Sequence, residues 1–461
     1  MSAGSRLRAA GAALLALLLM NVHAASAGDE TNVRGLGMAR TSVAASRGLD
    51  AVGINPANLA LDDGATLTIS LLPFGVGVGS DFLTYGLYNK FFTGVDSPTG
   101  RVARDLTESD KQELFAAFPG GTGRLGADAE ARPIGLAIRF GKFATFALTA
   151  TERVAATAVI PSSYARFLLE GMTPGSAYDF SGARGAASWT REYALSAGFP
   201  LPDVTFLRSW SAGLSVKLVH GFAYAAVTRD NTWLSAGSDG NLDANIDISG
   251  RSAHAEFHNS PFPAPAGSGI GFDAGLSGSV NDYMSAAISV TDIGSIRWDG
   301  GLREVYGQGH MHLDDPMNNA QRDSLEHAVT GSTRPGAAFS VGLPTTLRLG
   351  VQVELENIRW LKSILFGEMT AECDYAQGFT DYPGSSNVGR LSLGVEYRPW
   401  RFLPIRTGIA AGGPDHFNFA LGFGLKLWAL QIDVGSDNLG WLLSHDSFSR
   451  GSIGVAMTLK M

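Results

Sequence analysis

A strict two-residue alternation of side-chain character constrains this chain more than any other feature. Between Phe417 and Leu427, apolar residues occupy every odd position, and Asn418, Ala420, Gly422, Gly424 and Lys426 lie between them. Successive residues of a β-strand face opposite sides of the sheet, so such a strand has one apolar face and one small or polar face. The same alternation recurs at 67–71, 134–140, 210–218, 347–355, 391–397 and 453–461. The chain is therefore expected to be all-β.

The alternation is compatible with a soluble antiparallel sandwich, but three details favour a barrel in a membrane. Several segments approach the ~9–11 residues that a tilted strand needs to cross a bilayer. Trp210, Tyr397, Trp400 and Trp428 lie at strand ends, where aromatic girdles occur. The face opposite the apolar one carries full charges, at Arg139, Lys217, Arg348, Glu354, Arg390, Glu396, Arg398 and Lys426. We predict a transmembrane antiparallel β-barrel over residues 64–461, with these charges facing its lumen.

This assignment of faces has a direct consequence for substitutions. An arginine at Leu421 would face lipid and is expected to impair assembly, whereas a serine at Gly422 would face the lumen and is expected to be tolerated. A slip of one residue in register would exchange the two faces.

Weaker alternation near 143–151, 188–199, 243–257, 268–278, 282–292, 336–343, 403–410 and 429–435 brings the count to roughly fourteen to sixteen strands. Bacterial single-chain barrels have even strand numbers, and about fourteen is the number we expect. Short loop helices are predicted at 101–118, with Thr107 or Ser109 as N-cap, and at 162–171. Residues 299–335 are polar and irregular, and are expected to form an extracellular loop.

Residues 1–27 have the organisation of a secretory signal. Arg6 and Arg8 precede the short apolar run Ala9–Met20, and Ala25-Ser26-Ala27 resembles a cleavage site, so cleavage is expected after about Ala27. Export together with alternating strands predicts location in the outer membrane. The formal net charge of −8 argues against nucleic acid as a partner.

Residues 28–63 form neither a good strand nor a lipid-facing element, because they are rich in small and polar residues. Asn55-Pro56 favours a turn, and Asn58 tolerates a left-handed conformation. Irregular backbone at membrane depth is tolerated only where it is buried in protein or borders a wet cavity. We therefore expect this segment to fold inside the barrel as a hatch, with Asn55, Pro56, Ala57, Asn58 and Leu59 as its turn; the alternative is a periplasmic tail.

The segments Gly35–Ala39 and Ala51–Ala60 resemble the start of mature FadL-type outer-membrane proteins. The resemblance implies a fourteen-stranded barrel, an N-terminal hatch with an Asn-Pro-Ala-Gly-Leu-like turn, and transport of hydrophobic compounds. Asn58 stands where glycine is usual in that turn. The remaining chain, at 106–111, 164–171, 394–398 and 403–408, is similar to an uncharacterised subgroup of the same superfamily.

Three clusters contain residue types that can bind a metal ion or act in catalysis. His310 and His312 lie close to Asp314 and Asp315, and a second acidic set surrounds Cys373, at Glu368, Glu372, Asp374 and Asp381. Ser444, His445 and Asp446 are adjacent in sequence, which splays them apart on an extended chain instead of aligning them as a relay. We expect no catalytic residues, no metal and no cofactor.

These observations favour a barrel that transports or channels small hydrophobic or amphipathic compounds through a hatch-gated lumen. Its expected partners are outer-membrane lipid, the barrel-assembly machinery and a small hydrophobic ligand. The alternatives are a structural or secretion-accessory barrel that binds partner proteins through its loops, and a barrel enzyme.

Overall fold

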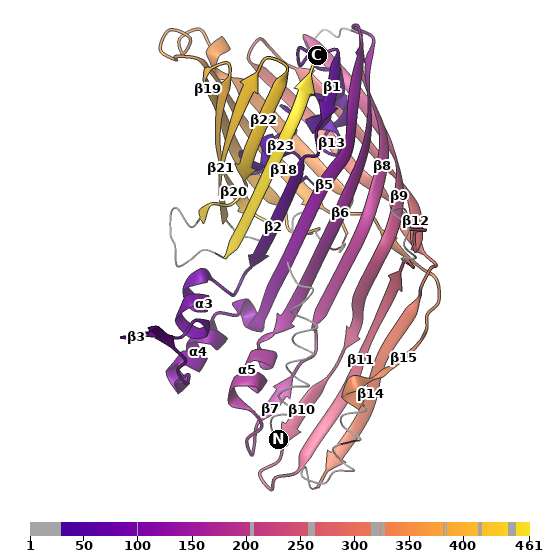
Figure 1. Cartoon of the computed structure of the whole chain (residues 1–461), viewed down its shortest axis with the longest axis vertical. Helices are drawn as coiled ribbons and strands as arrows, with labels where there is room; N and C mark the ends of the chain where they lie inside the picture. Colours follow the sequence, from indigo (N-terminus) through magenta and orange to yellow (C-terminus); the bar gives the residue numbers. More distant parts are fainter. Residues whose placement is uncertain are drawn as a thin grey trace.

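A single antiparallel sheet closes on itself to form the body of the molecule (Figure 1). The computed structural model describes residues 29–98, 100–202, 207–256, 263–314, 323, 328–380, 383, 385–413, 417–440 and 449–461. Closure occurs at the first stave, which consists of β1 (Leu67–Ser70) and β2 (Phe74–Ser80). Both strands pair with β23 (Arg450–Lys460) on one side and with β5 (Thr122–Phe140) on the other.

The other staves follow in chain order around the barrel. They are β6 (Ala144–Pro161), β8 (Arg184–Pro200), β9 (Ser209–Asp230), β12 (Gly267–Ser279), β13 (Met284–Trp298), β17 (Thr346–Glu354), β18 (Glu368–Gly378), β19 (Arg390–Trp400), β20 (Leu403–Gly412), β21 (Phe417–Leu427) and β22 (Leu430–Ser436). Within the described residues this makes a closed barrel of fourteen staves, which confirms the predicted architecture and strand number.

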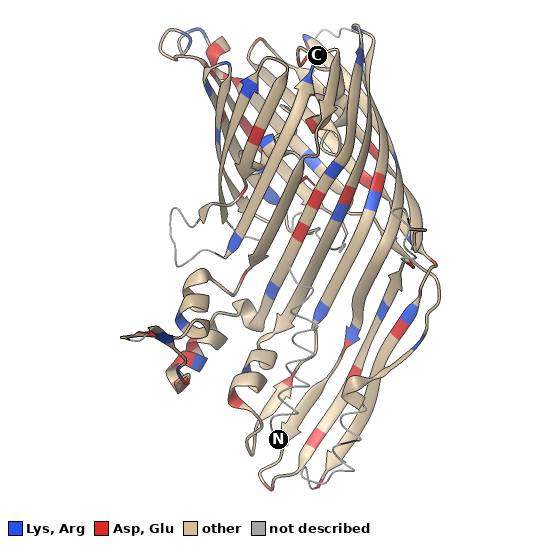
Figure 2. Ribbon diagram, viewed as in Figure 1, with Lys and Arg blue, Asp and Glu red and all other residues tan. Residues whose placement is uncertain are grey.

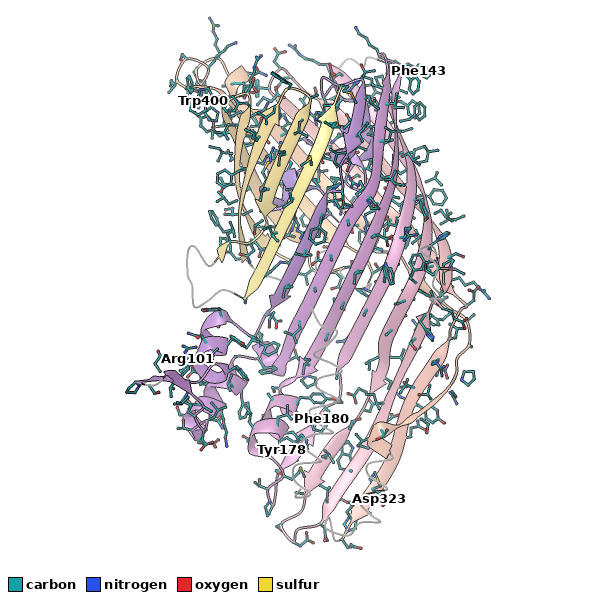
Figure 3. The ribbon with its side chains drawn as sticks, in the orientation of Figure 1. Arg101, Phe143, Tyr178, Phe180, Asp323 and Trp400 are labelled. Carbon is teal, nitrogen blue, oxygen red and sulfur yellow. The ribbon has the colours of Figure 1, made fainter. Side chains whose placement is uncertain are left out.

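The two ends of the barrel differ. At the end that holds the C-terminus, neighbouring strands are joined by short turns, and the exposed aromatic residues Phe143, Trp400 and Trp428 lie in these turns or beside them (Figure 3). The opposite end carries the longer connections, with α3 (Tyr85–Phe92), α4 (Glu108–Ala116) and α5 (Ser162–Glu170). Outer-membrane barrels have short periplasmic turns and longer extracellular loops, so the helical end is the extracellular one.

Both predicted loop helices are present. Thr107 is the N-cap of α4 and forms a capping box with Asp110, whose carboxylate accepts from the Thr107 N–H. The helix then ends before Pro119-Gly120-Gly121. Helix α5 follows Pro161 and ends at Gly171, which has a positive φ of 69°. None of the described helices is long and apolar enough to cross a membrane.

Several strands continue the wall beyond the barrel at its extracellular end. Strand β11 (Leu242–His254) pairs with the end of β9 and, over eleven residue pairs, with β14 (Arg303–Leu313). The other strands of this extension are β7 (Ala177–Asp179), β10 (Trp233–Ala236), β15 (Ser332–Pro335) and, at its base, β16 (Phe339–Gly342). The prediction that residues 299–335 are an irregular loop is therefore wrong for β14 and β15. Their composition is too polar to show a strand pattern, and hydrogen bonding to β11 supplies the order that apolar alternation does not.

The pattern of exposure follows the alternation of the sequence. In β9, Leu214, Val216 and Leu218 are exposed, whereas Ser215 and Lys217 are buried. The described strands show the same contrast around the wall, so the outer surface is apolar and the inner one is polar and glycine-rich. An apolar exterior on a closed antiparallel wall is the lipid-facing surface of an outer-membrane barrel.

Leu421→Arg tests the outer face. Leu421 pairs with Thr407 and Ser436 in the middle of the wall, and a charged residue at the bilayer midplane costs about 2–4 kcal/mol. We expect loss of the heat-modifiable folded band on unheated detergent gels. Lys426→Gln changes a charge of the same strand but on the inner face, and should fold normally. Equal folding of both variants would show that the register is wrong.

His312 tests the ion pairs of the extension. Its Nδ1 lies 2.6 Å from Asp243 Oδ1 on β11, and its Nε2 lies 3.1 Å from Asp314 Oδ1. The hydrogen bond to Asp243 and its charge raise the pKa of His312 above 6.5. The resulting support for β11–β14 pairing is fully present below pH 6.5 and is lost as pH rises through the raised pKa. An NMR titration should show the elevated pKa, and Asp243→Asn should lower it; an ordinary pKa in the unaltered chain would contradict this account.

Candidate functional site: the barrel interior

The interior of the barrel is occupied by residues 29–61, here called the N-terminal segment. Nearly all of these residues are buried. They form α2 (Val33–Leu36) and two 3₁₀ turns, η1 (Gly48–Ala51) and η2 (Pro56–Ala60). Turn η2 packs on β8, β9 and β12, whereas α2 packs on β21, β22 and β23. The segment thus touches staves on opposite sides of the wall, and it is visible behind β22 and β23 in Figure 1.

Glycines on the inner faces of the strands make room for this segment. A Cβ at Gly213 would lie 2.1 Å from the Pro56 carbonyl carbon, and a Cβ at Gly275 would lie 2.0 Å from Asn55 Oδ1. Across the barrel, a Cβ at Gly408 would lie 2.5 Å from the Met38 carbonyl carbon. These distances are shorter than any van der Waals contact. The backbone of the segment therefore approaches the wall only because glycine stands at these positions.

The same contacts overturn one expectation. A Cβ at Gly422 would lie 2.8 Å from the Cα of Gly37, so a serine there would collide with backbone. The expectation that Gly422→Ser is tolerated is wrong, because the space inside the wall at this point is filled and not open.

The predicted turn lies at the start of η2. The Asn55 side chain accepts from the Ala57 N–H at 3.1 Å and donates to the Leu276 carbonyl at 3.2 Å. Asn58 does not use a left-handed conformation; it lies within η2, and its amide donates to the Val43 carbonyl and to Ser46 Oγ, both at 2.9 Å. Pro56, Ala57 and Leu59 are buried. Asparagine at position 58 therefore ties the turn to the preceding part of the segment.

Ion pairs hold the segment to the wall. Arg34 donates to Glu372 on β18 at 2.8 Å and to Glu396 on β19 at 3.1 Å. Arg40 bonds Asp437, which follows β22, at 2.6 Å, and it also bonds Asp29 and Glu30 within the segment. All these carboxylates are buried. These polar anchors add to a small apolar cluster, in which Leu49, Val52 and Leu59 of the segment pack with alanines of the wall.

Two hydrogen bonds to Asp374 add a further anchor. Its Oδ2 accepts from the backbone N–H of Ser42 at 2.5 Å and of Val43 at 2.8 Å. Ser289 Oγ donates to the Ile54 carbonyl at 2.6 Å, and Arg132 donates to the Leu49 carbonyl at 3.1 Å. The irregular backbone of the segment thus receives partners from strands all round the barrel.

Several of the eight charged residues expected in the lumen contact the N-terminal segment or its ion-pair partners. Glu396 also accepts from Arg406 at 2.6 Å and pairs with Arg398 at 3.2 Å. Arg139 donates to the Leu61 carbonyl at 2.5 Å, and Arg390 donates to the Arg40 carbonyl at 3.5 Å.

The other members lie apart from the segment's ion pairs. Glu354 accepts from Asn357 at 2.7 Å, and Arg348 donates to Thr291 Oγ1 at 2.5 Å. Lys426 is half-buried on β21. Arg47 of the segment donates to carbonyls of its own segment at 2.9 Å and to Gln352 on β17 at 3.4 Å.

Lys217 is the centre of a second charge cluster. Its Nζ lies 2.8 Å from Asp273 and 2.5 Å from Asp292. Arg153 extends the cluster to Glu192 at 2.6 Å and to Glu130 at 3.1 Å. Figure 2 shows the resulting band of mixed charge across the wall. The strand alternation predicts that Lys217 faces inward, but it does not predict which carboxylates Lys217 pairs with, because contacts between neighbouring strands depend on their register.

An apolar group lies on the extracellular side of this cluster. Trp298 and Ile296 are fully buried, and Trp298 packs on Tyr224 with ring centroids 5.4 Å apart. A Cβ at Gly221 would lie 2.3 Å from the Trp298 ring. Gly221 follows Lys217 by four residues on β9 and faces the same side of the strand, so the indole lies on the inner side of the wall. The Arg251 guanidinium lies 4.3 Å from the Phe339 ring centroid. The interior thus changes from charged to aromatic along the barrel.

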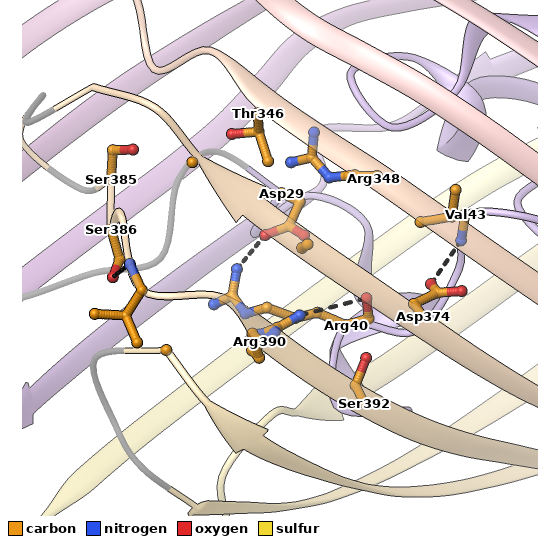
Figure 4. Close-up of a pocket in the computed structure, with 14 residues that line it drawn as sticks. Asp29, Arg40, Val43, Thr346, Arg348, Asp374, Ser385, Ser386, Arg390 and Ser392 are labelled. Carbon is orange, nitrogen blue, oxygen red and sulfur yellow. Dashed lines mark hydrogen bonds and ion pairs between the residues drawn. The ribbon is translucent and has the colours of Figure 1, made fainter.

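A small polar cavity of ≈ 60 Å³ lies between the segment and β17–β19 (Figure 4). Arg40, Arg348, Arg390, Asp29 and Asp374 line it, together with hydroxyl residues. Pockets for drug-sized ligands measure roughly 300–1,000 Å³ and are mostly apolar, so this cavity suits a small polar species.

Within the described part of the chain, the histidines and carboxylates of these clusters take part in separate ion pairs and ring contacts. His312 pairs with two aspartates in the extension, and His310 packs edge-on to Trp233. Glu372 and Asp374 hold the N-terminal segment, and Glu368 pairs with Arg398. Asp315, Asp381 and Ser444–Asp446 lie outside the described residues. In the described ranges, no group of three or more His, Cys, Asp or Glu residues is arranged to hold a metal ion.

A closed antiparallel wall, an apolar exterior and a polar interior define an outer-membrane-type β-barrel. The chain belongs to a family of unknown function, DUF5723, whose model matches residues 56–437. The uncharacterised subgroup predicted from the sequence is consistent with this membership. No curated protein sequence matches the chain.

Solved structures similar to this one include other barrels. The toluene transporter TbuX of Ralstonia pickettii is 13% identical with a TM-score of 0.47, covering 93% of this chain and 97% of that one. The toluene transporter TodX of P. putida is 9% identical with a TM-score of 0.45 over the same shares. A Pseudomonas aeruginosa FadL homologue is 13% identical with a TM-score of 0.39, covering 95% and 97%. The fold of this chain is established by its own strand pairing.

A matched pair of substitutions on β8 tests the glycine contacts. A Cβ at Gly198 would lie 2.6 Å from the Ala60 nitrogen, whereas a Cβ at Gly185 meets nothing closer than 3.6 Å. Gly198→Ala should therefore loosen the segment and increase trypsin cleavage at Arg47 in the folded barrel. Gly185→Ala should resemble the unaltered protein. Equal resistance of the two variants would mean that the segment does not depend on this contact.

Proposed function

We propose that the protein is a transporter or channel for small hydrophobic or amphipathic compounds, gated by the N-terminal segment acting as a hatch. The observation that carries this proposal is the way the segment is held. It fills the interior between opposite staves, where ion pairs and hydrogen bonds at separate points fix it beside a small apolar cluster. Such bonds can be exchanged for water, so displacement of the segment leaves the closed wall intact.

The substrate class is supported by the apolar group on the extracellular side of the segment. Tyr224, Trp298 and Phe339 pack on one another there, with Arg251 over two of the rings. Trp298 and Tyr224 are buried, but Phe339 and Arg251 are only partly so, and a ring next to a guanidinium offers contacts to a compound that has an apolar body and a polar end. Compounds of this kind would meet the aromatic group first and the charged segment afterwards. Passage is thus proposed to require movement of residues 34–63.

Deletion of residues 34–63 tests the gate. The barrel closes through β1, β2, β5 and β23, none of which includes the deleted residues, so folding should persist. In planar bilayers the deleted form should conduct ions far more freely than the intact chain. Removal of residues 108–116, which form α4 outside the barrel, is the control and should leave conductance unchanged. A deleted barrel that folds and conducts no better than the intact one would exclude the hatch.

A reversible cross-link sharpens this test. A Cβ at Gly394 would lie 2.9 Å from the Met38 Cβ, and disulfides need Cβ atoms about 3.5–4.5 Å apart, so a small shift accommodates the bond. Met38→Cys with Gly394→Cys, in a Cys373→Ser background, should abolish uptake of a small aromatic hydrocarbon into vesicles when oxidised and restore it when reduced. Uptake by each single cysteine variant should be the same with and without the oxidant. Uptake that continues through the cross-linked form would place the route elsewhere.

A second function is favoured by the extension. Strands β11 and β14 pair beyond the barrel wall, and α4 contacts α5 at the same end, which gives a structured extracellular surface. A structural or secretion-accessory barrel would use this surface to bind a partner protein. Such a barrel would show no uptake in the reduced cysteine pair, whereas removal of the extension would abolish partner binding.

A further inference from the structure

We propose that the polar cavity between the N-terminal segment and β17–β19 binds inorganic phosphate in its singly protonated form. The first reason is Arg348. Its side chain is buried, with 6% of the residue exposed, and its hydrogen bond to Thr291 involves a neutral hydroxyl. Among the described residues, no carboxylate lies within 4 Å of its guanidinium, and Asp292, which interacts with it electrostatically from farther away, is already paired with Lys217. A buried charge is unfavourable without a counter-charge, so an anion in the cavity would complete the arrangement.

The remaining cavity wall offers further groups that recognise an oxyanion. Arg390 on β19 contributes a second guanidinium to the lining, and Ser385 and Ser392 contribute hydroxyls (Figure 4). Ser385 Oγ is buried and has no hydrogen-bond partner in the described structure. Guanidinium groups bind phosphate oxygens through paired, charge-assisted hydrogen bonds. A cavity of ≈ 60 Å³ admits only a few waters, or one tetrahedral anion in their place.

Two carboxylates also line the cavity, and they narrow the choice of anion. Asp29 is bound by Arg40, a guanidinium that it shares with Glu30 and Asp437. Asp374 Oδ2 accepts the N–H groups of Ser42 and Val43, but its Oδ1 is buried without a partner. An acceptor in that position repels an anion that has no proton and receives a hydrogen bond from one that has. Hydrogenphosphate carries such a proton at neutral pH and sulfate does not.

Asp374 also links the proposed site to the N-terminal segment, because the backbone at Ser42 and Val43 is held by its other oxygen. Occupation of the cavity would join β17, β18 and β19 to residues 40–43 through one ion. Phosphate would thus stabilise the docked segment, whatever compound the barrel transports.

Isothermal titration of the mature chain in detergent with inorganic phosphate, sulfate and glycerol phosphate tests the proposal. We expect saturable phosphate binding, at least tenfold weaker binding of sulfate and of glycerol phosphate, and protection of Arg47 from trypsin by phosphate. Arg348→Gln should weaken phosphate binding at least tenfold. Arg139→Gln removes an inward arginine that bonds the segment outside the cavity, and should bind phosphate normally.

The Asp374→Asn variant tests how the cavity distinguishes phosphate from sulfate without removing the bonds that hold the segment. Asparagine keeps an oxygen for the N–H groups of Ser42 and Val43 but can donate toward the anion, so sulfate should then bind as well as phosphate does. Heat-modifiable migration on gels verifies that each variant is folded.

Absence of saturable phosphate binding, or equal affinity of the folded Arg348→Gln variant and the unaltered chain, would overturn the proposal. Equal phosphate and sulfate binding by the unaltered chain would overturn the role of Asp374. These readouts do not involve conductance or uptake, so they stand apart from the gate.

Discussion

Closure of the sheet between β1/β2 and β23 is the constraint on which the rest of the molecule depends. In a bilayer an unpaired backbone N–H or C=O has no water to bond, so an open sheet edge is excluded. Pairing of the first stave on both sides removes the edge. Once the wall is closed, the apolar face of most strands covers its outside, and the opposite face, rich in polar and small residues, is directed inward. The interior is therefore filled mainly by polar and small groups, with local apolar clusters such as the one around Trp298.

This protein fills its interior with its own N-terminal segment, and the fit depends on the two residue types that the inner faces supply. Glycines such as Gly213, Gly275 and Gly408 let the backbone of the segment touch the backbone of the wall. Charged residues such as Glu372, Glu396 and Asp437 then fix it through Arg34 and Arg40. Neither type would hold the segment alone. Glycine provides space without affinity, and a buried charge is stable only when its partner is correctly placed.

The wall and the interior differ in how they can respond to change. Strand pairing is continuous and cooperative, whereas the segment is attached at a limited number of polar points. Release of those points would expose charged residues, which water can solvate, together with apolar side chains such as Leu36, Met38 and Leu59. The proposed gating depends on this difference between the wall and the segment. The aromatic group near Trp298 and the proposed phosphate cavity near Arg348 are lined by different residues, and they are proposed to act independently.

The sequence by itself determined the wall. Alternation in 417–427 and in the other strands fixes which side chains face lipid, and the number of such segments leads to fourteen staves, because the period of a strand is a local property of the backbone. Local rules also located α4 through Thr107 and the turn at Asn55. The tertiary structure alone decided the partners of the inward charges, the closeness of Gly422 to Gly37, and the pairing that makes β14 a strand. These depend on which residues meet across the barrel, and register and curvature set those meetings, so no pattern along the chain contains them.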